Sequence, residues 1–219
     1  MTYFFNTTII KPEKNSIINN AIILFHGYGG DGKDISALTL SWKRFLPNTV
    51  FLCPDAHEVC AINSIGFQWF DLTKDNPEYI LKESIKGEKK ISQFINEVKN
   101  KFKLNNSQIC LLGFSQGCMM SINLGLTGNE NYNCVVGFSG KIINKKDLLE
   151  RKNSNTKMLL LHGDQDTIVS PTYLLEAKDF LTRNNVEIET IMIKNCDHHI
   201  SVKASSLALD YIKNNFAVL

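Results

Sequence analysis

The sequence lacks any run of apolar residues long enough to cross a membrane. A helix that spans a bilayer needs about 18 or more consecutive apolar residues, and every apolar run in the chain is shorter. Residues 1–6 carry neither a basic region nor an apolar stretch suited to export. We therefore expect a cytoplasmic protein without stable membrane insertion.

An excess of one charge is also missing. The chain has 24 Lys and Arg residues against 22 Asp and Glu residues, which gives a net charge of +2. No basic run is interleaved with aromatic residues, as a nucleic-acid-binding surface would require. We expect no nucleic-acid partner.

Cysteine pairs of the metal-binding kind are missing as well, because none of the six cysteines belongs to a Cys-x-x-Cys pair. Most of them lie in apolar runs, which favours buried free thiols in a reducing compartment. A chain of 219 residues can bury about 70% of its unfolded surface, so it needs neither a disulfide nor a metal to fold. We expect one domain covering residues 1–219.

The chain does contain a regular alternation of short apolar runs and amphipathic segments. The apolar runs predict strands over residues 3–10, 21–25, 49–53, 109–113, 134–140, 157–161 and 187–193. Helical spacing predicts helices over residues 34–45, 79–102, 171–184 and 201–216, and one directly after Ser115. This alternation predicts an α/β fold, with a mostly parallel central sheet and helices on both faces. Functional sites in such sheets lie at the C-terminal ends of strands.

A Gly-x-Ser-x-Gly motif at residues 113–117 joins an apolar strand to an apolar helix. Glycines at both ends let strand and helix pack closely around a strained turn, which would expose the hydroxyl of Ser115. A serine hydroxyl is a poor nucleophile until a base takes its proton. A glycine-bounded turn before a core helix gives the same pattern, so the nucleophile hypothesis requires a histidine and an acid further along the chain.

Two polar segments meet that requirement, because each directly follows a predicted strand. The first supplies Asp164 or Asp166 as the acid, and the second supplies His198 or His199 as the base. Serine, acid and histidine then follow the chain order of an α/β-hydrolase triad. A metal site is disfavoured, because adjacent histidines point apart and no further ligands are suitably spaced.

A glycine-rich loop after the second predicted strand supports a competing hypothesis. Gly27, Gly29 and Gly32 match the dinucleotide-binding pattern G-x-G-x-x-G, and an acidic residue, Asp55, follows about 20 residues later. This pattern would fit a dinucleotide-dependent oxidoreductase. It leaves the order of serine, acid and histidine unexplained.

The same loop has another use in a serine hydrolase. A backbone N–H opposite the nucleophile must hold the oxyanion that forms during the reaction. The donors here would be the amides of Tyr28, in the loop, and Gln116, next to Ser115.

Together these motifs resemble the acyl-protein thioesterase and carboxylesterase family of the α/β-hydrolases, also called the phospholipase/carboxylesterase group. The resemblance covers residues 22–211, and its landmarks are residues 24–29, 54–56, 69–71, 113–117, 162–166 and 198–201. It implies Ser115 as the nucleophile, His198 as the base of a His-x-Ile-Ser pattern and Asp166 as the acid of a His-Gly-x-x-Asp pattern. It also implies an oxyanion hole formed by the amides of Tyr28 and Gln116, and no cofactor.

The chain departs from this family's pattern at two positions. His57 stands where the family usually has proline, and Asp197 stands before the catalytic histidine where the family usually has glycine. His57 would change the shape and polarity of the rim of the site. Asp197 would add a charge beside the base.

A long aromatic segment, residues 55–78, is expected to contribute to the site as a loop. Its aromatic residues, Trp69 and Phe70 among them, would either wall an apolar acyl-binding site or pack in the core. An apolar acyl site fits a small-molecule ester, a lysophospholipid or an acylated protein as substrate. The oligomeric state stays open between a monomer and a homodimer.

The sequence therefore predicts a serine hydrolase of carboxylic esters or thioesters. It would act through a Ser115–His198–Asp166 triad and an acyl-enzyme. The alternatives are a non-catalytic binding protein with the same fold, and the dinucleotide-dependent oxidoreductase.

Overall fold

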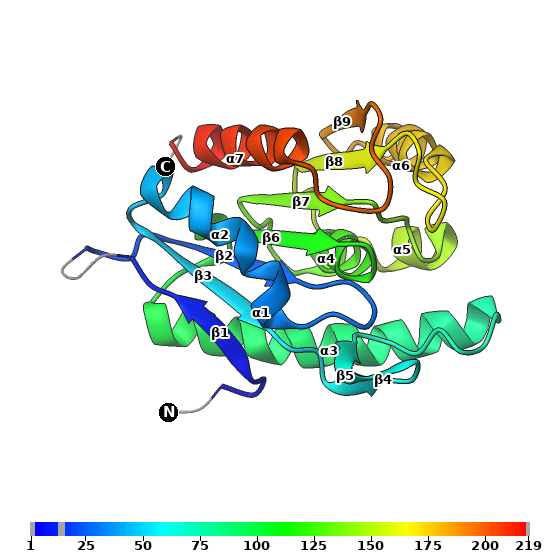
Figure 1. The fold of residues 1–219 in the computed structure, drawn as a ribbon, viewed down its shortest axis with the longest axis horizontal. Helices are drawn as coiled ribbons and strands as arrows, with labels where there is room; N and C mark the ends of the chain where they lie inside the picture. Colours follow the sequence, from blue (N-terminus) through cyan, green and yellow to red (C-terminus); the bar gives the residue numbers. More distant parts are fainter. Residues whose placement is uncertain (1–2, 13–15, 218–219) are drawn as a thin grey trace.

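The computed structural model describes residues 3–12 and 16–217, and its centre is a seven-stranded sheet (Figure 1). The strands lie in the order β1-β3-β2-β6-β7-β8-β9. They are β1 (Thr7–Ile10), β2 (Asn20–Phe25), β3 (Thr49–Pro54), β6 (Ile109–Phe114), β7 (Cys134–Phe138), β8 (Met158–Gly163) and β9 (Ile188–Ile193). β1 pairs antiparallel with β3, and the other neighbours pair in parallel.

The inner strands are buried on both faces, which explains their continuous apolar sequences. β3, β7 and β8 are buried at every residue. The edge strands β1 and β9 are only partly buried. The predicted α/β fold with a mostly parallel sheet is confirmed.

Helices cover both faces of the sheet. One core cluster includes residues of α3 (Pro77–Phe102), α4 (Gln116–Thr127), α5 (Lys145–Arg151) and α6 (Thr172–Arg183). A second cluster includes residues of α1 (Gly32–Ile35), α2 (Ala37–Trp42) and α7 (Val202–Phe216). The indole N–H of Trp42 donates to the Ser205 hydroxyl at 3.0 Å, which links α2 to α7 side by side (Figure 1).

The single helix predicted over residues 34–45 is wrong, because this segment forms α1, α2 and a short 3-10 helix, η1 (Lys43–Phe45). The chain turns at Ser36, whose hydroxyl donates to the Lys33 carbonyl at 2.6 Å. The Ser36 carbonyl in turn accepts the Thr39 hydroxyl at 2.7 Å. Side-chain bonds of this kind compete with the regular bonds of a helix.

The segment 55–78 is not irregular throughout, since it contains an antiparallel hairpin, β4 (Glu58–Cys60) and β5 (Asn63–Gln68). A register irregularity within β4 interrupts the alternation that would have predicted the hairpin. Phe67 exchanges backbone hydrogen bonds of 2.9 Å with Gly29 and Gly30, which ties the hairpin to the glycine-rich loop. The short helix α5 was likewise not predicted.

A membrane-spanning helix and paired cysteines are both missing from the sequence, and the structure bears on each. Across residues 3–12 and 16–217, no helix has the length and apolar character needed to cross a membrane. All six cysteines are buried and free, as predicted. The two core clusters therefore hold the fold without cysteine cross-links.

Candidate active site

Ser115 occupies a strained turn between β6 and α4. Its backbone dihedrals are φ 52° and ψ −112°, a conformation that is rare for a residue with a side chain. The turn closes only because its flanking glycines lack side chains. A Cβ on Gly113 would overlap the carbonyl of Gly117, and a Cβ on Gly117 would overlap the carbonyl of Phe25. The Ser115 hydroxyl is therefore held at the carboxyl end of β6.

His198 faces Ser115 from the loop after β9. Its Nε2 lies 3.0 Å from Ser115 Oγ, and its Nδ1 lies 2.7 Å from Asp166 Oδ2. Since a carboxylate only accepts, Nδ1 carries the ring proton and Nε2 can accept the serine proton. Three residues separated by 83 and 32 positions in the chain thus come together in one hydrogen-bonded row.

Asp166 is buried behind His198 in the turn after β8. Its Oδ1 accepts the N–H groups of Ile168 and Val169 at 2.9 Å each, and its Oδ2 also lies 3.1 Å from His162 Nε2. Burial raises the pKa of Asp166, but the hydrogen bonds from His198 and the two backbone amides outweigh burial and hold the pKa below its ordinary value. The carboxylate therefore stays ionised and can orient the imidazole.

The two residues expected to supply oxyanion donors are Gln116, which follows Ser115, and Tyr28, which follows Gly27. Gln116 is the first residue of α4, so its N–H has no partner within the helix. Tyr28 lies in the glycine-rich loop, where Gly27 packs so closely that a Cβ there would lie 3.4 Å from Ser115 Cβ. Tyr28 and His198 also line the same cavity. Gln116 is thus adjacent to the serine in sequence, and Tyr28 follows a glycine that packs against the serine.

His26 fixes the glycine-rich loop. Its Nε2 accepts the Ala56 N–H at 3.0 Å, so the ring proton lies on Nδ1, which donates to the Gly27 carbonyl at 2.7 Å. Burial lowers the pKa of His26 and favours the neutral ring. The neutral ring keeps both bonds and holds the backbone next to Tyr28. The support that His26 gives this loop was not predicted from the sequence.

Trp69 and Phe70 do not reach a substrate site. Their side chains lie in the core, 0% and 1% exposed, where the Trp69 ring packs edge-on against Phe25. The backbone at this point instead holds the side chain of Gln116. The Trp69 N–H donates to Gln116 Oε1 at 2.8 Å, and Gln116 Nε2 donates to the Phe70 carbonyl at 2.7 Å. The expectation that these rings wall an acyl site does not fit their burial.

Asp197 and His57, the two departures from the family pattern, pair with residues other than Ser115, His198 and Asp166. The Asp197 carboxylate pairs with Nδ1 of His199, and both residues are exposed. The His57 ring stacks on Phe5 and lies 3.3 Å from the Glu58 carboxylate. Burial, together with a nearby lysine, lowers the pKa of His57. Asp197 is therefore engaged with the neighbouring histidine rather than with His198.

In the glycine-rich loop, a backbone N–H group that a pyrophosphate would need already has an acceptor within the protein. Asp55 Oδ1 accepts the Gly32 N–H at 2.8 Å, and Gly32 opens α1, a helix of four residues. The amide that a phosphate would need is thus taken by a carboxylate. This contact disfavours the dinucleotide hypothesis. Within the part of the chain that the structure describes, no group of three His, Cys, Asp or Glu residues could hold a metal ion.

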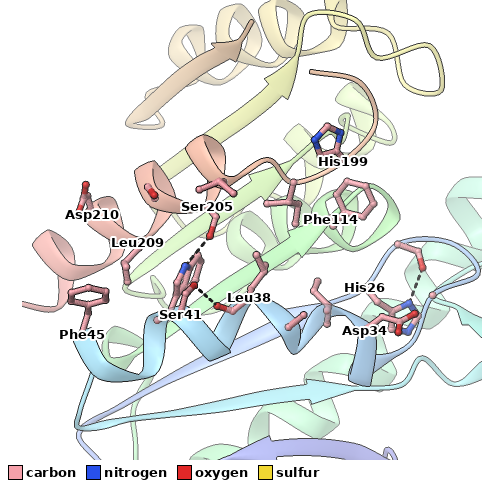
Figure 2. A pocket seen from close by; sticks show the side chains of 18 of the residues that line it. His26, Asp34, Leu38, Ser41, Phe45, Phe114, His199, Ser205, Leu209 and Asp210 are labelled. Atoms are coloured by element: carbon pink, nitrogen blue, oxygen red, sulfur yellow. Dashed lines mark hydrogen bonds between the residues drawn. The ribbon is translucent and has the colours of Figure 1, made fainter. Parts of the chain in front are cut away.

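A cavity of about 920 Å³ is lined by Tyr28 and His198, among other residues. Figure 2 shows it with Phe114 and His199 at one end and Phe45 at the other. It lies between α2 and α7, and most of its lining is apolar. Sequence reasoning missed this cavity, because two segments far apart in the chain create it by packing together. The helical spacing of apolar residues in both segments was the available signal.

Comparison with known proteins relates nearly the whole chain to esterases. The model of a family described as phospholipase/carboxylesterase matches residues 6–216. Acyl-protein thioesterase 1 of Kluyveromyces lactis is 30% identical over 176 residues, which cover 75% of this chain and 77% of that protein. Acyl-protein thioesterase 1 of Emericella nidulans is 28% identical over 166 residues, 68% of this chain and 70% of that protein. The crystal structure of esterase PE8 has a TM-score of 0.91 and 27% identity, covering 96% of this chain and 98% of that one.

Proposed function

Since the chain belongs to the phospholipase/carboxylesterase family of α/β-hydrolases and is an ester or thioester hydrolase, we propose that Ser115, His198 and Asp166 form its catalytic triad. One observation carries the proposal. The hydroxyl at the strained turn lies 3.0 Å from His198 Nε2, and Nδ1 of the same ring lies 2.7 Å from the Asp166 carboxylate. Nucleophile, base and orienting carboxylate are thus in hydrogen-bond reach of one another, as covalent catalysis requires.

In the first half of the reaction, Ser115 Oγ attacks the acyl carbonyl while His198 Nε2 takes the hydroxyl proton. The resulting oxyanion accepts the N–H groups of Tyr28 and Gln116, each of which lowers the barrier by about 3–4 kcal/mol. Asp166 stabilises the imidazolium. His198 then gives its proton to the leaving oxygen or sulfur, the bond to that atom breaks, and the acyl-enzyme remains.

In the second half, His198 takes a proton from a water molecule, which attacks the acyl-enzyme. Collapse of the second tetrahedral intermediate releases the carboxylic acid and returns the proton to Ser115. The cycle needs no metal and no organic cofactor.

For the substrate, we propose an acylated protein carrying a thioester, or a small-molecule ester such as a lysophospholipid. The names of the relatives, acyl-protein thioesterase and esterase, support both classes. For the location, we propose the cytoplasm, because six buried free thiols fit a reducing compartment. We also propose one domain over residues 1–219, in which residues 55–78 support the site.

The first experiment is labelling with a fluorophosphonate, read out as intact mass. We expect one adduct on the wild type and none on Ser115→Ala, with loss of ester turnover by several orders of magnitude in the variant. Ser139 offers a matched control, because it directly follows the neighbouring strand β7 and also has a positive φ, 50°. Ser139→Ala should still form the adduct. A folded wild type that forms no adduct would refute the triad and favour a non-catalytic binding protein. An adduct that persists in Ser115→Ala would refute Ser115 as the nucleophile.

A further inference from the structure

The cavity beside His198 is a groove between one face of α2 with its flanking turns and one face of α7 (Figure 2). The α7 wall is a stripe of residues three or four positions apart: Val202, Ser206, Leu209 and Lys213. The opposite wall has the same spacing: Ile35, Leu38, Trp42 and Phe45. This spacing places the α7 residues on a single helix face. The opposite wall is assembled from three successive elements, with Ile35 in α1, Leu38 and Trp42 in α2, and Phe45 in η1. At 1.5 Å per residue, the stripe from Val202 to Lys213 makes the groove about 16 Å long.

The buried ring of Trp42 forms the floor of the groove. Trp42 is 1% exposed, and its indole N–H donates to the Ser205 hydroxyl across the gap between the helices at 3.0 Å. Charged side chains lie at the two ends. Asp34 is near His26 at one end, and Asp210 is near Phe45 at the other (Figure 2). The cationic groups of Arg44 and Lys213 lie over the Phe45 ring. The middle of the groove is therefore apolar, with only serine hydroxyls as polar groups.

The near end of the groove meets the catalytic base. His198 lines it together with Phe114, and the two ring centroids are 4.9 Å apart. In the proposed reaction, His198 donates its proton to the departing oxygen or sulfur, so the leaving group must lie against this ring. A chain attached to that atom would continue from His198 into the groove.

We propose that the groove is a leaving-group site that takes an extended, apolar alcohol or thiol moiety. Among the substrates proposed above, this site favours a small-molecule ester or thioester over a lysophospholipid, whose leaving group is charged. The proposal rests on the triad described under Proposed function. During acylation, the bond from Ser115 Oγ to the carbonyl carbon forms and the carbon–oxygen or carbon–sulfur bond breaks. The proton moves from His198 to the departing atom. The released alcohol or thiol lies along the groove, from His198 toward Phe45.

Two series of thioesters test this assignment. One series keeps an acetyl group and lengthens the thiol from ethanethiol to octanethiol, and the other keeps ethanethiol and lengthens the acyl chain. We expect kcat/KM of the wild type to rise at least about tenfold along the thiol series, because each added methylene is buried in the apolar groove.

A groove-filling variant and a matched control locate the effect. Ser206 is exposed on the α7 wall, so Ser206→Trp should fill the groove without disturbing the core. This variant should lower kcat/KM of the octanethiol ester at least about tenfold more than that of the ethanethiol ester. Lys203→Trp, exposed on α7 outside the groove, should behave like the wild type. If Ser206→Trp does not fold, Ser41→Trp on the opposite wall provides the same test.

Each other outcome overturns the proposal in a recognisable way. Equal rates along the thiol series, or an equal loss for both thioesters in Ser206→Trp, would show that the groove does not hold the leaving group. A changed preference in the acyl series alone would assign the groove to the acyl chain instead. In these cases the fluorophosphonate adduct at Ser115 would still support the triad, whereas its absence from a folded protein would refute the triad itself.

Discussion

Of two buried titratable residues at the candidate active site, one is held ionised and the other neutral. Asp166 accepts hydrogen bonds from His198 and from two backbone amides, so its carboxylate stays ionised. His26 accepts one N–H and donates to one carbonyl, so its ring stays neutral. Burial acts against the charged form of both residues. Hydrogen bonds outweigh it at Asp166, whereas it prevails at His26. The first residue orients the base, and the second holds the loop that carries Tyr28.

The neutral state of His26 predicts a pH effect on stability. Its pKa is lowered by burial in the folded protein and returns to about 6.5 in the unfolded chain. Below about pH 6.5, the unfolded chain therefore binds a proton that the folded protein does not, and the free energy of unfolding falls as the pH falls. His26→Gln keeps an acceptor for the Ala56 N–H but cannot titrate. We expect the unfolding free energy of the wild type to fall more steeply than that of the variant between about pH 7 and pH 5.5.

Urea titrations of both proteins at the two pH values measure this difference. His57, whose pKa is also lowered, is present in both proteins, so its contribution cancels. Equal pH slopes for wild type and variant would contradict the neutral, buried His26.

Among the larger elements, the segment 55–78 acts as a support for the expected oxyanion hole. The Ala56 N–H holds His26, and the backbone of Trp69 and Phe70 holds the Gln116 side chain. The residue that precedes β4 thus supports the loop of Tyr28, and the residues that follow β5 hold Gln116 itself. Its aromatic residues serve the site through their backbone and their packing rather than as a substrate wall.

The close approach of β6, α4 and β2 predicts an asymmetry between two glycines of the same region. A Cβ on Gly117 would overlap the Phe25 carbonyl, and backbone cannot move aside cheaply. We expect Gly117→Ala to lower the free energy of unfolding by about 3 kcal/mol or more. Gly128 follows the other end of α4, has an ordinary φ of −66° and leaves 3.3 Å to its nearest neighbour. Gly128→Ala should change stability by no more than about 1 kcal/mol, and similar losses for both variants in urea would contradict the tight turn.

Across the whole molecule, the two core clusters contain five of the six cysteines, and Cys60 lies in the hairpin strand β4. All six are buried and free, and burial raises the pKa of Cys53 and of Cys118 to about 12. A buried thiol that resists ionisation is a poor nucleophile. We expect a thiol reagent such as dithionitrobenzoate to find no reactive thiol in the native protein and six after unfolding without reductant. Fewer than six thiols in the unfolded protein would reveal a disulfide.

Local sequence patterns are enough to predict the strand–helix alternation and the turn at Ser115. Burial on both faces requires continuous apolar strands, and the tight turn requires the glycines on either side of the serine. The choice of Asp166 and His198 over their neighbours depends on the family resemblance, because spacing alone leaves two candidates for each.

Other features arise only when distant segments meet. Ser115 and His198 are 83 positions apart, and Trp42 and Ser205, which close the floor of the groove, are 163 apart. The inward direction of Trp69 also depends on contacts with β2 and α4 that no local pattern encodes. Hydrogen bonding and packing between such segments are set by the three-dimensional arrangement of the sheet and its helices. For this reason the tertiary structure decides which aromatic residues face the core and where a substrate chain can lie.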